Sequence, residues 1–133
     1  MSKSVREIYG KNELESCIYN YQPMIDSFGQ PIIQIDDDGY SGDTRVFFYD
    51  NVEDRFGHLI FGWGSCSVCD ALQGCINMDE VQELYNELEN DIKWFKTKAE
   101  ALEWFNTHDW EGNYYGHCEE TKKYVDVVKE YLR

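Results

Sequence analysis

The sequence has little positive charge. Its 133 residues include 12 lysines and arginines against 26 aspartates and glutamates, which gives a formal net charge of −14. Binding to a nucleic-acid backbone needs many basic side chains that displace counterions, and anionic membranes also attract basic segments. The composition therefore disfavours direct nucleic-acid binding and membrane adhesion, and it favours a basic protein surface as the partner.

Long apolar runs are also lacking. The first residues do not resemble a secretory signal, and nowhere do 18 consecutive apolar residues occur that could span a bilayer. Without such a signal, an odd number of cysteines is expected to stay reduced rather than to form a disulfide framework. The five cysteines are Cys17, Cys66, Cys69, Cys75 and Cys118. We therefore expect a cytoplasmic protein with reduced thiols.

A complete catalytic signature is missing as well. The three histidines, His58, His108 and His117, are too few and too scattered to define a hydrolase. Ser65 does not lie in a G-x-S-x-G nucleophile elbow, and there is no glycine-rich phosphate loop. We therefore predict a protein that is not an enzyme.

The hydrophobic content is high enough for a folded domain. Hydrophobic residues make up 42% and aromatic residues 16% of the chain, unlike the aromatic-poor sequences that stay disordered. A chain of this length buries roughly two-thirds of its unfolded surface, enough for one core. With no repeats, low-complexity tracts or linkers, the sequence predicts a single acidic domain over residues 1–133.

Apolar patterning predicts strands in the first half of the chain. Short apolar runs at 32–35, 45–49 and 58–63 are separated by polar connections, which is typical of two successive hairpins. Before them, residues 11–22 have the apolar spacing of a helix, and Pro23 is expected to end it.

Helical spacing dominates the second half. It predicts helices over 66–75, 79–89, 97–105 and from about 119, with an extended piece at 92–95. Together the elements predict an α+β fold: an antiparallel β-meander of three to four strands with helices packed on one face.

The negative charge is concentrated in the middle of the chain. Residues 26–120 contain 21 acidic and five basic side chains, a local charge of −16, whereas 1–25 is neutral and 121–133 carries +2. Two groups of acids stand out, one in a predicted hairpin loop and one on a predicted helix face: Asp36, Asp37, Asp38, Glu80, Glu83 and Glu87. Like charges four residues apart cost a helix a few tenths of a kcal/mol, so helix stability does not explain the pattern. Either the acids only solubilise the protein, or they present to a basic groove the charge pattern of nucleic-acid phosphates.

The most distinctive segment runs from residue 62 to 75. Its two thiols at C-x2-C spacing, Cys66 and Cys69, can bind zinc together with His117. The fourth ligand is left open between Cys75, His108 and Cys118. A redox dithiol is an alternative, but both prolines lie upstream, whereas a thioredoxin-like protein has a cis-proline loop downstream. The thiols can also be small buried side chains where a strand meets a helix. No cofactor other than this zinc is expected.

An aromatic segment precedes the last predicted helix. Trp110 and Tyr114 lie in it, and large aromatic side chains of this kind often dominate binding energy at protein interfaces. Trp110 can equally cap the core, so both interpretations stay open.

Three short motifs carry a family resemblance. They are GSCSVCDAL at 64–72, IKWF at 92–95 and HDWE at 108–111. In this order and spacing, they resemble small acidic proteins encoded by phages and prophages of Gram-positive bacteria, over roughly residues 45–132. The resemblance implies a phage protein in the cytoplasm of a host cell.

By analogy with the inhibitors that phages use against restriction and CRISPR nucleases, we expect a non-enzymatic inhibitor of a host defence nuclease. A CRISPR effector is the leading candidate, and the acidic faces would act as a nucleic-acid mimic. The alternative is a zinc-stabilised protein-interaction module whose acidity is only solubilising.

Overall fold

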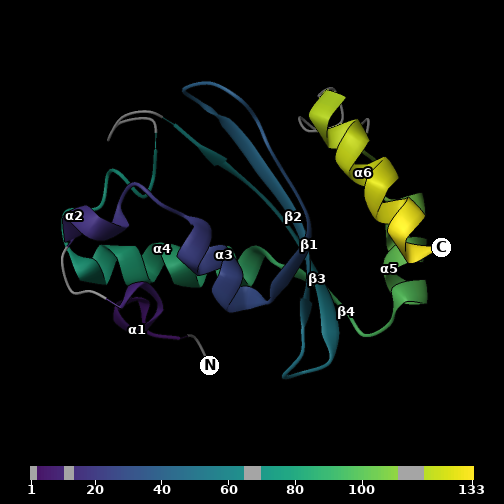
Figure 1. The fold of residues 1–133 in the computed structure, drawn as a ribbon, viewed down its shortest axis with the longest axis horizontal. Helices are drawn as coiled ribbons and strands as arrows, with labels where there is room; N and C mark the ends of the chain where they lie inside the picture. The colour runs from purple at the N-terminus through teal and green to yellow at the C-terminus, as the bar shows by residue number, and fades with distance from the viewer. Residues whose placement is uncertain (1–2, 11–13, 65–69, 111–118) are drawn as a thin grey trace.

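The computed structural model describes residues 3–10, 14–64, 70–110 and 119–133 (Figure 1). Four strands form one antiparallel sheet in the order β1-β2-β3-β4. They are β1 (Gln30–Asp36), β2 (Gly42–Asp50), β3 (Arg55–Trp63) and β4 (Lys93–Phe95). The predicted α+β class and the antiparallel meander are therefore confirmed.

Strand β2 is buried on both of its faces. Val46 and Phe48 pack into one hydrophobic core, whereas Phe47, between them, packs into another. Successive side chains of a strand point to opposite faces, so an uninterrupted apolar run needs cover on both sides of the sheet.

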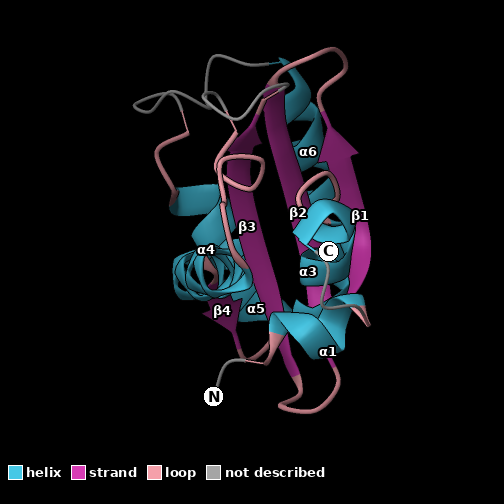
Figure 2. Ribbon diagram, turned by 90° about the vertical axis from the view of Figure 1, so that its left-hand side faces the viewer, coloured by secondary structure: helices cyan, strands magenta, loops and turns pink. Residues whose placement is uncertain are grey.

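Helices accordingly cover both faces, so the expectation that they pack on one face is wrong. One face carries α1 (Val5–Tyr9), α2 (Leu14–Cys17), α3 (Gln22–Phe28) and α4 (Met78–Asp91). The other carries α5 (Lys98–Thr107) and α6 (Glu119–Leu132). Figure 2 looks onto the first face, with α6 behind the sheet. No helix within the described ranges is both long and apolar enough to cross a bilayer.

The region before the sheet differs from its prediction. Instead of one helix over 11–22 that Pro23 ends, α3 begins at Gln22 with Pro23 in its first turn. Proline is tolerated there because the first N–H groups of a helix have no partner within the helix. In the segment predicted to be helical over 66–75, the described part, 70–75, forms turns and irregular chain.

Helices α4 and α5 both begin at a side-chain cap. The Asn77 side chain accepts a hydrogen bond from the backbone N–H of Glu80 at 2.9 Å, and Thr97 accepts one from Glu100 at 3.1 Å. Each such cap contributes about 1 kcal/mol. The caps explain why the sequence patterns locate both helix starts well.

Candidate functional site

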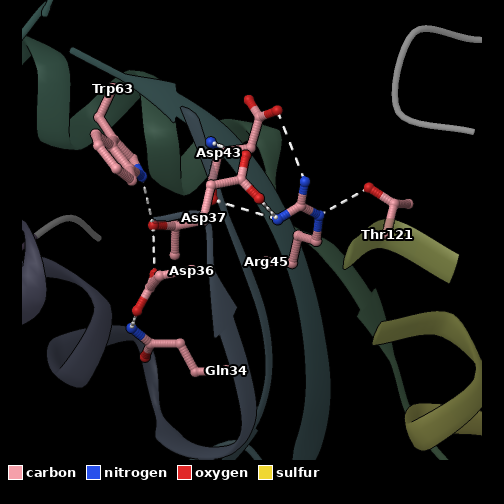
Figure 3. A network of polar contacts seen from close by, with 8 residues as sticks. Gln34, Asp36, Asp37, Asp43, Arg45, Trp63 and Thr121 are labelled. Atoms are coloured by element: carbon pink, nitrogen blue, oxygen red, sulfur yellow. Dashed lines mark hydrogen bonds and ion pairs between the residues drawn. The ribbon is translucent and has the colours of Figure 1, made fainter. Parts of the chain in front are cut away.

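The acidic hairpin between β1 and β2 makes many internal contacts (Figure 3). Arg45 is fully buried, and its Nη1 donates a hydrogen bond to Asp37 Oδ1 at 2.8 Å. The guanidinium also donates from Nε to Thr121 Oγ1 at 2.7 Å and lies 3.8 Å from the Asp43 carboxylate. Asp37 therefore neutralises a buried cation, and this cation, Arg45, joins the hairpin to α6.

The surroundings of Asp37 favour its charged form. Burial alone would raise the pKa of Asp37. The hydrogen bonds from Arg45 and from the Asp43 backbone N–H, together with the Arg45 charge, outweigh burial and lower this pKa below its ordinary value. Asp37 is thus part of the fold rather than a free contact residue.

Asp36 points to the other side of the hairpin. Its Oδ1 accepts a hydrogen bond from Thr44 Oγ1 at 2.6 Å, and Thr44 in turn accepts one from the Trp63 indole at 3.0 Å (Figure 3). Asp38 is exposed at the turn. The three aspartates therefore do not form one uniform acidic patch.

Exposed acidic side chains occur along the whole length of α4. Glu80 is not counted among them, because its Oε1 accepts a hydrogen bond from the backbone N–H of Ile76 at 2.9 Å at the start of the helix. The remaining exposed carboxylates at four-residue spacing are called the acidic row below: Asp79, Glu83, Glu87 and Asp91. The sequence prediction included the middle pair but did not single out the two ends, although the spacing alone contains that signal.

The acidic row is not interrupted by a cation. α4 contains no lysine or arginine, whereas the outer surface of α6 mixes acids with Lys122, Lys123 and Lys129. A four-residue step advances about 6 Å along a helix axis, so successive row residues are neighbours. The result is a continuous negative stripe on one helix.

Trp110 caps the core that lies between the sheet and α5. Its indole N–H donates to the carbonyl oxygen of Phe105 at 3.0 Å, and its ring contacts those of His58 and Trp104. It remains partly exposed. Tyr114, the other predicted anchor, lies outside the described residues.

The predicted zinc ligands Cys66, Cys69 and His117 also lie outside the described residues. Within the described ranges, no group of three or more histidine, cysteine, aspartate or glutamate side chains could hold a metal ion. Cys17 and Cys75 are buried thiols. The zinc site stays a prediction.

Asp70 has a structural role that the sequence patterns did not predict. This buried carboxylate accepts hydrogen bonds from the Tyr21 hydroxyl at 2.7 Å, from the Leu72 N–H at 2.9 Å and from the Gly64 N–H at 3.3 Å. Gly64 precedes residues 65–69 and Asp70 follows them. One carboxylate therefore links Gly64 and Leu72, which lie on either side of the C-x2-C segment.

The fold and its surface define an acidic α+β domain in which some carboxylates hold the structure and others face the solvent. Comparisons with protein-family models, with curated proteins and with solved structures found no match.

Proposed function

We propose that the protein is a non-enzymatic inhibitor that binds a basic, nucleic-acid-binding surface of a host defence nuclease through the acidic row of α4. One observation carries the proposal: the row presents four exposed carboxylates on one helix that contains no lysine or arginine. The resemblance to small acidic phage proteins makes a CRISPR effector the first target to test.

The charge density of the row suits a groove that contacts a few phosphates. Its carboxylates follow one another at about 6 Å along the helix axis, whereas one DNA strand carries a charge about every 3.4 Å. The row thus has about half the linear charge density of a single strand. Complementary charge of this kind raises the association rate and selects the partner, and it weakens as salt screens it.

The other predicted acids have different parts in this proposal. Asp37 and Glu80 hold the hairpin and the start of α4 through their internal hydrogen bonds. Glu83 and Glu87 are exposed at the centre of the row and make the main contact. Asp38, which is exposed at the hairpin turn, adds to the negative field.

Competition with DNA tests this function. A purified CRISPR effector with its guide is mixed with labelled target DNA and increasing amounts of the protein, at about 50 mM and about 300 mM salt. We expect the protein to reduce DNA binding, and to do so less effectively at the higher salt. A panel of restriction nucleases is tested in parallel. If none of these enzymes loses DNA binding, the proposed target class is wrong.

A matched pair of variants separates the effect of the acidic row on inhibition from the effect of total charge. Glu83→Gln with Glu87→Gln is expected to weaken inhibition about 10-fold, which corresponds to about 1.4 kcal/mol. The control, Asp126→Asn with Glu130→Gln, removes the same charge at the same spacing from exposed positions of α6. Equal losses of inhibition in the two variants would contradict a contact through α4.

A further inference from the structure

A hollow of about 320 Å³ opens where the acidic row ends. β4 pairs with β3 only as far as His58, opposite Lys93, and the hollow lies beside β3 from that point. Its walls include His58, Asp91, Lys93, Trp104, His108 and Trp110. Asp91 is therefore both the last residue of the acidic row and part of this hollow.

Aromatic rings form one corner of the hollow. Trp104 and Trp110 stand almost perpendicular, at 85°, with ring centroids 5.7 Å apart, and His108 stacks on Trp104 at 4.4 Å. The face of an indole ring attracts cations more strongly than that of any other aromatic side chain. This corner favours a positively charged group.

His58 adds a hydrogen-bond acceptor to the hollow. The Tyr124 hydroxyl lies 2.6 Å from His58 Nδ1, and its single proton goes to the carbonyl oxygen of Val46 at 2.9 Å. We therefore assign the ring proton to Nδ1, which then donates to the Tyr124 oxygen, because both contacts are then hydrogen bonds. Burial, helped by the charge of His108, lowers the pKa of His58 to about 3, so at neutral pH the ring is uncharged and Nε2 keeps its lone pair.

The Nε2 atom of His58 is left for an occupant of the hollow. His58 is only 7% exposed, and no residue of the described ranges forms a hydrogen bond with its Nε2. No fully buried polar side-chain atom in these ranges lacks a partner, and His58 lines the hollow, so we place Nε2 at the hollow. A hydrogen-bond donor in the hollow would satisfy it.

Lys93 and, in its charged form, His108 oppose a cation there. The Lys93 Nζ lies over the Phe95 ring, 5.9 Å from the ring centroid. Against these groups stand the Asp91 carboxylate, the two indole rings and the His58 lone pair. The balance favours a cation that also donates hydrogen bonds.

We infer that the hollow receives an arginine side chain of the partner protein, with its guanidinium against Trp104 and Trp110 and its N–H groups donating to Asp91 and His58. The inference rests on the proposed function, because the basic surface supplies the arginine. A guanidinium is planar, carries five N–H donors and is less strongly hydrated than the lysine ammonium group. The volume lies near the lower end of ligand sites, which suits a single side chain.

Peptide titration tests the arginine site without the partner. The probe is acetyl-Gly-Arg-Gly-amide, and the matched peptides carry citrulline, which has nearly the same shape without the charge, or lysine. Binding is followed through the NMR signals of the indole N–H groups. We expect the arginine peptide to shift the signals of Trp104 and Trp110, and to bind at least about 5-fold more tightly than the citrulline peptide. Trp63 and Trp94, which do not line the hollow, serve as internal controls.

Charge variants test the geometry of the site. Asp91→Asn is expected to weaken binding of the arginine peptide about 3- to 30-fold. Asp79→Asn removes the same charge from the far end of the row and should leave binding unchanged, whereas Lys93→Gln should strengthen it. Equal binding of the citrulline peptide, or no response at about 20 mM arginine peptide, would overturn the inference. Weaker binding in Lys93→Gln together with stronger binding in Asp91→Asn would instead reveal an anion site.

The outcomes of the two proposals can be told apart. Arginine binding in the hollow without inhibition of any nuclease would reject the proposed function and keep the hollow as an arginine site. Inhibition that depends on Glu83 and Glu87 but is unchanged by Asp91→Asn would keep the function and reject the arginine site.

Discussion

Arg45 shows how one side chain ties distant parts of this acidic chain together. It is fully buried between Asp37, from the hairpin, and Thr121, in the first turn of α6 (Figure 3). Removing one partner of a buried ion pair leaves an uncompensated charge, which costs about 3–5 kcal/mol where both partners are buried. Asp37 is partly exposed, and the Asp43 carboxylate stays 3.8 Å from the guanidinium, so the cost of losing Asp37 is expected to be smaller.

Substituting Asp37 should therefore destabilise the fold. Asp37→Asn is expected to lower the free energy of unfolding by about 1–3 kcal/mol at pH 7, measured by urea denaturation. The matched change Asp38→Asn, at an exposed position, should cost less than about 0.5 kcal/mol.

The same pair of variants tests how the stability contributed by Asp37 depends on pH. The pKa of Asp37 is lowered in the folded state. Its carboxylate therefore contributes fully to the free energy of unfolding above the ordinary pKa of 3.8, and this contribution is lost as the pH falls through the folded-state pKa. Asp37→Asn should thus lose less stability than the wild type below about pH 4. Identical profiles of stability against pH for Asp37→Asn and the wild type would contradict this role of Asp37.

At the scale of elements, α4 carries charge that its own stability does not favour. Acids near a helix N-terminus interact well with the helix dipole, whereas acids near the C-terminus oppose it. Asp79 lies in the first turn of α4, but Asp91 is its last residue, and no basic residue occurs in the last turn. An acid at that end is consistent with a binding role.

This asymmetry predicts opposite effects at the two ends of the row. Asp91→Asn should stabilise the protein by about 0.3–1 kcal/mol at low salt, and Asp79→Asn should destabilise it by a similar amount. Thermal unfolding of both variants measures the difference. Combined with the peptide titration, Asp91→Asn would then be the variant that gains stability and loses arginine binding. If Asp91→Asn destabilised the protein instead, the carboxylate would have a structural role.

Sequence patterning predicted the elements with a clear period. The runs at 45–49 and 58–63 lie within β2 and β3, and the helical pattern at 79–89 lies within α4. Periodicity could not show that helices cover both faces of the sheet, because the second face depends on packing between residues far apart in the chain. The use of Pro23 at a helix start instead of a helix end is likewise decided by tertiary context.

Much less of the candidate site could be read from the sequence. The exposed pair Glu83 and Glu87 follows from helical spacing, but the pairing of Asp37 with Arg45 depends on the hairpin register. The hollow joins residues of β3, α4 and α5 that no spacing rule connects. The free acceptor on His58 follows from the proton of Tyr124, a residue 66 positions away.

The whole molecule carries its charge of −14 unevenly. α4 and α6 lie on opposite faces of the sheet (Figures 1 and 2). α4 carries the uninterrupted acidic row, whereas α6 mixes acidic with basic side chains. Plain solubility needs only a net charge, not a particular position for it. The location of the contact therefore distinguishes a binding surface from a merely solubilising one.

Carboxylate footprinting locates the contact most directly. The protein, free and mixed with the nuclease that it is proposed to inhibit, is labelled with a carbodiimide and glycine ethyl ester, and modified residues are quantified by mass spectrometry. We predict that the partner protects Glu83, Glu87 and Asp91, and that Asp126 and Glu130 on α6 are labelled equally in both samples. Equal labelling of the acidic row with and without the partner would contradict binding through α4.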